Sequence, residues 1–110
     1  MTAKGYQIGE RIKSFKPSRL LYHDTVKNPH ADSKYEFVDL DTLLAESDIL
    51  ICMCSLTKET EGLFNMKLFK KMKPNAIFIN CSRGVVVNQD DLCQALKTNI
   101  IAGAGVLLII

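Results

Sequence analysis

The stretch Asp48–Cys54, which reads DILICMC, decides the fold class of this chain. After its leading aspartate it is uninterruptedly apolar, whereas a strand with one solvated face alternates apolar and polar side chains. Two further apolar segments, 76–80 (AIFIN) and 100–110 (IIAGAGVLLII), follow later in the chain. Short runs of this kind are typical of parallel strands buried on both faces, so we expect a parallel sheet that is covered on each side.

Segments with helical spacing separate these strands. Three polar residues are candidate N-caps, whose side chains accept hydrogen bonds from free N–H groups in the first turn of a helix. They are Asp41 before TLLAES, Asn65 before a helix that carries Leu68, Phe69 and Met72, and Asn88 before a helix that carries Leu92, Ala95 and Leu96. Pro74 is expected to end the second of these helices because proline cannot continue a helix.

The alternation of helices and strands extends to the beginning of the chain. Ile8, Ile12 and Phe15 stand at i, i+4 and i+7, which predicts a helix that presents all three on one face and ends before Pro17. Strands are expected at 19–23 (RLLYH) and 35–40 (YEFVDL), with a polar loop between them. The alternation predicts an α/β fold with a parallel sheet and right-handed crossovers.

Composition argues against several classes of partner. A chain of 110 residues has room for one domain, and a net charge of +2 without a dense Lys/Arg run argues against nucleic acid or a membrane surface. No apolar run reaches the ~20 residues that cross a bilayer, and no signal peptide is evident, so we expect a cytoplasmic protein. The cysteine spacing predicts no metal site, and we expect buried, reduced thiols at Cys52, Cys54, Cys81 and Cys93.

Ligands of parallel α/β sheets bind at the carboxyl ends of the strands. The segments at these ends are His23-Asp24-Thr25, Cys54-Ser55-Leu56 and Asn80-Cys81-Ser82-Arg83-Gly84. Asp24 is interpreted either as an acceptor for ribose hydroxyls or as the start of a turn. Arg83 is interpreted either as a clamp for a carboxylate, through two parallel hydrogen bonds, or as a surface arginine in a tight Arg-Gly turn. No nucleophile completes a catalytic triad with His23.

The segment 54–96 carries a longer set of motifs: L-T-x-x-T-x-G-L, M-K, I-N-x-S-R-G and V-N-x-x-D-L, in that order. With these motifs the chain, from Gly5 to about Val106, resembles the D-isomer-specific 2-hydroxyacid dehydrogenase family, and within it the glyoxylate/hydroxypyruvate reductases. The resemblance implies an oxidoreductase whose Rossmann domain binds NAD(H) or NADP(H). The implied substrate is a small 2-keto acid, which is reduced to a D-2-hydroxy acid.

The resemblance also implies roles for single residues. Arg83 matches the arginine that binds the substrate carboxylate and orients the keto group. The matching cofactor-binding positions are Gly5, His23, Asp24, Thr25, Cys54, Ser55 and Cys81. Asp24 falls at the position that reads the ribose, and Thr25 stands where relatives that prefer NADP carry arginine. This pattern favours NAD over NADP.

The sequence also departs from the family pattern. Gly5 corresponds to the third glycine of the G-x-G-x-x-G fingerprint, MTAK stands in place of the first two, and Gly9 falls where relatives can carry alanine. The family's first strand, substrate domain and catalytic Glu and His have no counterpart, and Leu107 stands where an aspartate is expected. We therefore expect residues 1–110 to be a partial NAD(P)-binding domain, an incomplete Rossmann-type sheet lacking its first strand and the start of the glycine loop.

Two functions remain open at this point. The chain is either part of a reductase that is inactive in this form, or a non-catalytic short form. A short form would bind nucleotide weakly or pair with a full-length relative, and a homodimer is also conceivable. In the strand order 3-2-1-4-5-6 the missing strand is central. We therefore expect strands 19–23 and 48–54 to be separated, each with an unpaired edge.

Overall fold

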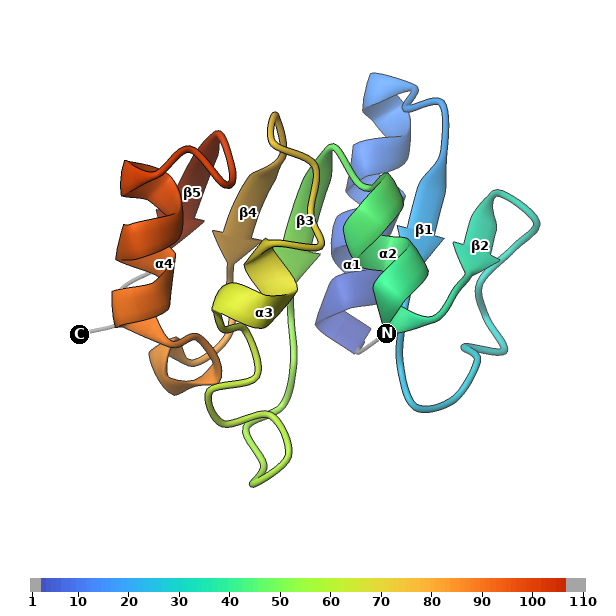
Figure 1. The fold of residues 1–110 in the computed structure, drawn as a ribbon. Coiled ribbons are helices and arrows are strands. Elements are labelled where there is room, and N and C mark those ends of the chain that lie inside the picture. The colour runs from blue at the N-terminus through green and yellow to red at the C-terminus, as the bar shows by residue number, and fades with distance from the viewer. Residues whose placement is uncertain (1–2, 107–110) are drawn as a thin grey trace.

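The computed structural model describes residues 3–106. In chain order the elements are α1 (Ala3–Ile12), the 3-10 turn η1 (Lys13–Phe15), β1 (Leu20–Tyr22), β2 (Tyr35–Phe37), α2 (Leu40–Glu46), β3 (Ile49–Cys52), α3 (Met66–Phe69), β4 (Ile77–Asn80), the 3-10 turn η2 (Gly84–Val86), α4 (Gln89–Lys97) and β5 (Gly103–Val106) (Figure 1). Helices and strands alternate as the sequence predicts, and every pairing between these strands is parallel.

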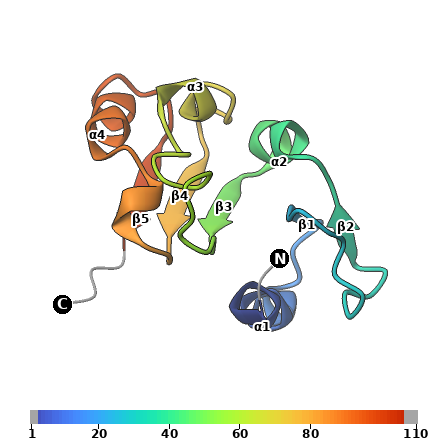
Figure 2. The same ribbon diagram turned by 90° about the horizontal axis from the view of Figure 1, so that it is seen from below.

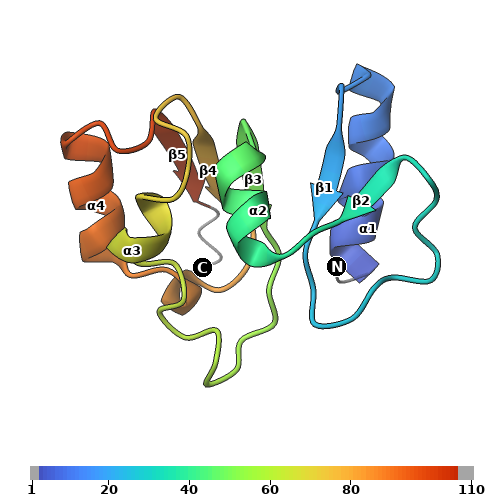
Figure 3. The same ribbon diagram turned by 45° about the vertical axis from the view of Figure 1, so that its right-hand side comes forward.

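The strands form two separate sheets. One contains β1 and β2, and the other has the order β3-β4-β5. Figure 3 shows β1 and β3 as the facing edges of the two sheets, and neither is hydrogen-bonded to the other. This arrangement confirms the expectation that strands 19–23 and 48–54 are separated.

The helices lie in layers on the two sides of the sheets. Figure 2 shows α2, α3 and α4 on one side and α1 on the other, below the sheet of β1 and β2. Under α3 and α4 lies the main core, which includes a cluster of phenylalanine rings. The ring centroid of Phe78 on β4 lies 4.9 Å from that of Phe64 and 5.4 Å from that of Phe69. Leu44 of α2 is fully buried in the same core.

Among residues 3–106 the opposite face of the β3-β4-β5 sheet is partly exposed at Ile49 and Ile77, so the expectation of strands buried on both faces is wrong for this part of the sheet. Leu50 and Phe78 face the helices and are buried, while the side chains of Ile49 and Ile77 are 58% and 41% exposed. Ile49 and Ile77 are directly paired in the register of β3 and β4. Because successive side chains of a strand point to opposite faces, both belong to the side that α3 and α4 do not cover.

The sheet of β1 and β2 has its own aromatic core. The ring of Tyr35 stacks on Tyr6 of α1 at 5.8 Å and meets Tyr22 edge-on at 6.3 Å. The Tyr35 hydroxyl donates a 2.6 Å hydrogen bond to Glu10 of α1. Gly9 is buried under this ring, and a Cβ there would lie 2.7 Å from the Tyr35 hydroxyl oxygen. In this chain an alanine at Gly9 would therefore require a shift of Tyr35.

Two of the three predicted N-caps are confirmed. The side chains of Asn65 and Asn88 accept hydrogen bonds from the backbone N–H groups of Leu68 and Asp91. The third is corrected, because Asp39 caps α2 through the N–H of Thr42 and Asp41 lies inside the first turn.

Several predicted element boundaries also change. α3 is a single turn that ends at Phe69, not at Pro74, and β2 ends at Phe37, not at residue 40. The 3-10 turn after α1 has a tighter repeat than an α-helix. It leaves Phe15 83% exposed and off the face of Ile8 and Ile12.

The cysteines are all free, but they are not all buried. Cys52 is buried, Cys54 and Cys81 are half-buried, and Cys93 is exposed on α4. None of the helices within residues 3–106 has the length and apolar character that a membrane crossing requires.

Candidate functional site

The carboxyl ends of β1, β3 and β4 lie at one edge of the molecule, beside the first turn of α1 (Figure 1). The parallel direction of the strands causes this, since each strand then delivers its following residues to the same edge. The residues predicted from the sequence at the ends of these strands and at the start of α1 are therefore gathered here. The contacts of each residue show whether its side chain supports the local structure or remains available to a ligand.

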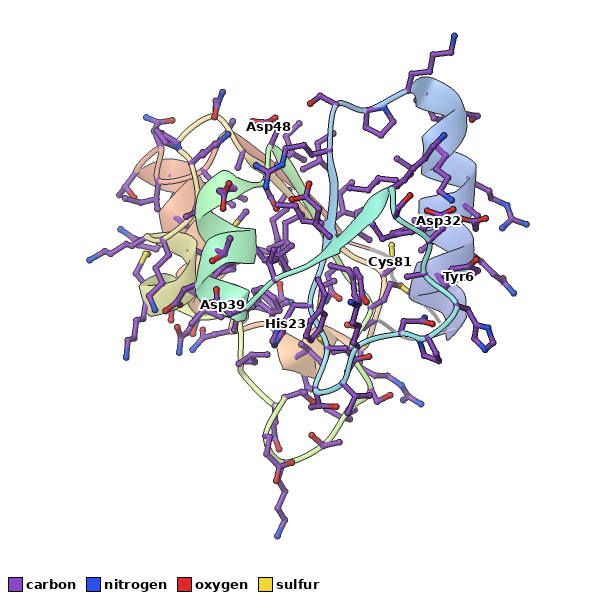
Figure 4. The ribbon with its side chains drawn as sticks, turned by 90° about the vertical axis from the view of Figure 1, so that its right-hand side faces the viewer. Tyr6, His23, Asp32, Asp39, Asp48 and Cys81 are labelled. Atoms are coloured by element: carbon purple, nitrogen blue, oxygen red, sulfur yellow. The ribbon has the colours of Figure 1, made fainter. Side chains whose placement is uncertain are left out.

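His23 follows β1 and has a structural contact. Its Nδ1–H donates a 2.9 Å hydrogen bond to the carbonyl of Val38, and its ring stacks on Phe37 with 6.3 Å between the centroids. Figure 4 shows His23 beside the strand, with Asp39 at the start of α2 nearby. The imidazole thus links the end of β1 to the segment that follows β2.

Asp24 is half-buried at the end of β1, and Thr25 is exposed. The backbone N–H of Thr25 donates a 2.7 Å hydrogen bond to Oδ1 of Asp24. Burial raises the pKa of the Asp24 carboxyl, but hydrogen bonds, including this one, lower it by more, so the pKa is below its ordinary value. The group is therefore an ionised acceptor at neutral pH, which suits hydrogen bonds from hydroxyl donors.

Cys54 and Ser55 follow β3 and begin a polar loop. Ser55 is exposed, and its carbonyl accepts a 2.7 Å hydrogen bond from the Thr60 hydroxyl. Thr57 and Thr60 hold the loop further, because the Thr57 N–H donates to Oγ1 of Thr60 at 2.7 Å. These bonds explain the threonines of the L-T-x-x-T motif as local supports of the loop that carries Ser55.

Asn80, the last residue of β4, organises the turn that carries Cys81 and Arg83. It is only 2% exposed, and its Oδ1 accepts hydrogen bonds from the N–H of Ser82 at 2.9 Å and from its hydroxyl at 2.6 Å. The Asn80 side-chain amide also donates to the carbonyl of Arg83 at 3.3 Å. The sequence places Asn80 and Ser82 in the segment at the end of this strand, and the structure adds the role of both in holding the turn. A polar residue that ends an otherwise apolar strand was the available signal.

Cys81 and Arg83 are held by the backbone in different ways. The N–H of Cys81 donates to the carbonyl of Cys52 at 3.0 Å, which extends the pairing of β3 and β4 by one residue. Arg83 precedes η2 in extended conformation, and its side chain is exposed. Among the described residues its guanidinium has no ion-pair or hydrogen-bond partner. Both interpretations of Arg83 therefore stand. Arg83 lies in an Arg-Gly turn, and its guanidinium also presents free donors at the edge where the carboxyl ends of the strands lie.

The described residues fit a dinucleotide in their chemistry. Gly5 lies in the first turn of α1, whose N-terminal end faces this edge and favours negative charge. Asp24 supplies a carboxylate acceptor at the end of the neighbouring strand. Within residues 3–106 no group of His, Cys, Asp and Glu side chains is arranged to hold a metal ion.

Two surface hollows among the described residues lie at opposite ends of β1. One, of about 410 Å³, lies between the first turn of α1 and the loop after β1 and is lined by Tyr6, Gln7, Asn28 and His30. The other, of about 530 Å³, lies where Lys16–Leu20 enter β1, at the opposite end of that strand. The larger of these hollows is thus remote from the predicted site residues. The carboxyl ends of the strands therefore locate the candidate site better than the size of the hollow does.

The sequence matches a known family over most of its length. Residues 1–106 match the family described as "D-isomer specific 2-hydroxyacid dehydrogenase, NAD binding domain". Over 103 residues the chain is 50% identical to glyoxylate reductase/hydroxypyruvate reductase from Homo sapiens and covers 31% of that protein. It is 44% identical to glyoxylate reductase from Thermococcus litoralis, of which it also covers 31%. Each match includes 92% of this chain.

A solved structure confirms the Rossmann-type fold class. The NAD-complexed form of a D-isomer specific 2-hydroxyacid dehydrogenase from Lactobacillus delbrueckii ssp. bulgaricus superposes with a TM-score of 0.92 and 32% identity. The superposition covers 96% of this chain and 33% of the other. The chain thus spans about a third of the length of the proteins that it matches.

Proposed function

Because the chain belongs to the D-isomer specific 2-hydroxyacid dehydrogenase family, we propose that it provides nicotinamide-dinucleotide binding for a glyoxylate or hydroxypyruvate reductase. The match of residues 1–106 to the NAD-binding domain of that family carries the proposal. The 50% identity to a glyoxylate reductase/hydroxypyruvate reductase supports the choice of substrate class. The substrate is accordingly a small 2-keto acid, and the product is a D-2-hydroxy acid.

The dinucleotide occupies the carboxyl edge of the strands in this proposal. Gly5 lies near its diphosphate, at the N-terminal end of α1. His23, Asp24 and Thr25 lie near one ribose, with Asp24 accepting hydrogen bonds from the ribose hydroxyls. Cys54, Ser55 and Cys81 line the path toward the nicotinamide. An ionised Asp24 would repel a 2′-phosphate, which supports NAD as the preferred cofactor.

Arg83 binds the carboxylate of the keto acid in this proposal. Its guanidinium is exposed and unpartnered among the described residues, so two parallel hydrogen bonds to a carboxylate displace no existing ion pair. The bound cofactor supplies the hydride. Arg83 fixes the orientation of the keto acid relative to it, which is a positioning role.

We propose further that residues 1–110 bind nucleotide without reducing a keto acid. The histidines of this chain, His23 and His30, follow β1, whereas Arg83 follows β4, and β3 lies between them in space. No histidine is therefore placed beside the keto group to donate a proton. General acid catalysis typically contributes ~10²–10⁴-fold to such a step.

A second candidate function is association with a longer relative. The open edges of β1 and β3 support it, because unpaired strand edges are templates for another strand. Nucleotide binding and pairing are compatible, since the ligand edge lies at the ends of the strands and the open edges lie along their sides.

A fluorescence titration of NADH with the 110-residue chain tests the main proposal. We expect saturable enhancement of NADH emission, reduced in the Asp24→Ala variant, and no consumption of NADH when glyoxylate or hydroxypyruvate is added. Absence of any NADH binding by a chain that unfolds cooperatively would refute the nucleotide assignment. Oxidation of NADH that depends on either keto acid would refute the proposed lack of catalysis.

A further inference from the structure

We propose that Cys52 and Cys54 are a redox modification site, at which a reversible intramolecular disulfide forms at the carboxyl end of β3. The two Sγ atoms lie 3.7 Å apart, and both thiols are free. The Ser82 hydroxyl lies 3.5 Å from Sγ of Cys52. Residues 30 positions apart in the sequence thus place a hydroxyl beside Cys52, one of the two convergent thiols.

The backbone geometry suits this bond. Cys52 and Cys54 are two residues apart, so both side chains point to the same side of an extended chain. Two extended residues span roughly 6.6 Å, which is within the ~4.4–6.8 Å range of Cα separations in disulfides. β3 ends at Cys52, so Met53 and Cys54 lie beyond the strand and can adjust as the sulfurs close to about 2.05 Å.

The local environment also favours ionisation of one thiol of the pair. The hydrogen bond between the two sulfurs lowers the pKa of Cys52, burial raises it, and the contact with Ser82 lowers it, with a lowered pKa as the net result. The same hydrogen bond, together with burial, raises the pKa of Cys54. The two sulfurs therefore share one proton after the first ionisation, and either can carry the thiolate charge.

Exposure decides which sulfur meets an oxidant. Cys52 is only 3% exposed, whereas Cys54 is half-buried and reachable from the loop that it begins. The lower pKa favours the thiolate on Cys52, and Cys54 attacks the oxidant when the shared proton moves to Cys52, the arrangement in which Cys52 donates the hydrogen bond to Cys54. Cys52 then completes the disulfide. Cys81 follows β4, and Cys93 lies on α4. Neither sulfur contacts those of Cys52 and Cys54.

Hydrogen peroxide is the oxidant in the proposed reaction. The Cys54 thiolate attacks one peroxide oxygen, the O–O bond breaks, hydroxide leaves, and Cys54 becomes a sulfenic acid. The Cys52 sulfur then attacks the Cys54 sulfur, the S–O bond breaks, and the hydroxyl departs as water with the Cys52 proton. The first hydroxide takes up a solvent proton. Two thiols are oxidised, one peroxide is reduced to two waters, and an added dithiol reverses the disulfide by exchange.

Peptide mapping after mild oxidation tests the site. Cleavage after lysine and arginine places Cys52 and Cys54 together in peptide 35–58, Cys81 in 72–83 and Cys93 in 84–97. After stoichiometric peroxide and N-ethylmaleimide, we expect peptide 35–58 to be two hydrogens lighter and unlabelled. Treatment with dithiothreitol before labelling should restore two labels. The other two peptides should remain labelled throughout.

Variants decide between this bond and other outcomes. Cys54→Ser should abolish the loss of two hydrogens, and Cys93→Ser, the matched control, should preserve it. Circular dichroism melting shows whether each variant is folded. Unchanged labelling of peptide 35–58, its cross-linking to 72–83 or 84–97, or oxidation to sulfinic acid without a disulfide would each overturn the proposal.

The consequence for ligand binding rests on the proposed function. Cys54 directly precedes Ser55, so closing the disulfide moves the backbone at the proposed cofactor edge. We expect the oxidised chain to bind NADH at least threefold more weakly than the reduced chain, and Cys54→Ser to lose this dependence on oxidation. Peptide mapping by mass detects the disulfide even if no NADH binds. A failure of the disulfide proposal can therefore be told apart from a failure of the proposed NADH binding.

Discussion

At the scale of single residues, the proposed preference for NAD over NADP depends on Asp24. Its half-buried, ionised carboxylate stands at the end of β1, and the neighbouring Thr25 carries no positive charge. Removal of a hydrogen bond to a charged acceptor typically costs roughly tenfold or more in affinity. We therefore expect Asp24→Ala to weaken NADH binding about tenfold in fluorescence titration. NADPH binding should become stronger, because the charge that repels its 2′-phosphate is removed. Thr25→Ser is the matched control, and an equal loss for both cofactors would contradict a ribose-reading role.

Gly9 provides a second test at the residue scale. Alanine is normally the better helix former by ~1 kcal/mol, but its Cβ would meet the buried Tyr35 ring. Overpacking of this kind costs ~1–3 kcal/mol. We expect Gly9→Ala to lower the free energy of unfolding by about 1 kcal/mol in urea titration. In a Tyr35→Ala background the same change should stabilise the chain, and stabilisation in the original background would show that the ring moves freely.

At the scale of elements, α2 tests which carboxylate begins the helix. The Thr42 N–H lies 2.7 Å from Oδ1 of Asp39, whereas Asp41 makes only an exposed ion pair with Lys71. Asn88→Ala should cost ~1 kcal/mol as a reference cap. We expect Asp39→Ala to lower the free energy of unfolding, measured by urea titration, by a similar amount. Asp41→Ala should lower it by less than half as much. An equal or larger effect of Asp41→Ala would indicate that Asp41, and not Asp39, is the N-cap of α2.

The same helix start depends on pH. The hydrogen bond of the Asp39 carboxylate with Thr42 lowers the pKa of Asp39 below its ordinary value. A carboxyl group with a lowered pKa stabilises the fold above its ordinary pKa, and this stabilisation is lost as the pH falls through the lowered value. We expect the difference in midpoint between the original chain and Asp39→Ala to shrink in acid. A difference that does not change between pH 7 and pH 2 would contradict a role for the charge.

Sequence patterns predicted the elements better than their ends. Apolar runs and caps are local signals, so the order of helices and strands and the caps at Asn65 and Asn88 were predictable. Asp39 and Asp41 are chemically the same acceptor, and only the backbone conformation at Asp39 decides between them. The Met66 N–H also bonds to Asp91 of α4 at 2.9 Å, a contact across 25 positions that no local pattern reveals.

At the scale of the whole molecule, the open face and edge of the second sheet are the main liability. Ile49 and Ile77 form a paired, exposed apolar patch, and β3 presents an unpaired edge beside it. We expect the 110-residue chain to self-associate at micromolar concentration in sedimentation experiments. Ile77→Lys should reduce association, whereas Val26→Lys, a change at a 70% exposed residue in the β1–β2 loop, should not. A monodisperse original chain would contradict this expectation.

The sequence by itself determined the fold class, the order of the elements and the strand ends at which the candidate site residues lie. These follow from apolar runs, caps and the parallel direction of strands, all of which act over short stretches of chain. Only the tertiary structure decided which sheet face is covered, that Tyr35 occupies the space above Gly9, and that Asn80 supports Arg83. It also brought the Ser82 hydroxyl to 3.5 Å from Sγ of Cys52. Such contacts join residues from different elements, and their energy depends on packing in three dimensions, which one-dimensional spacing does not encode.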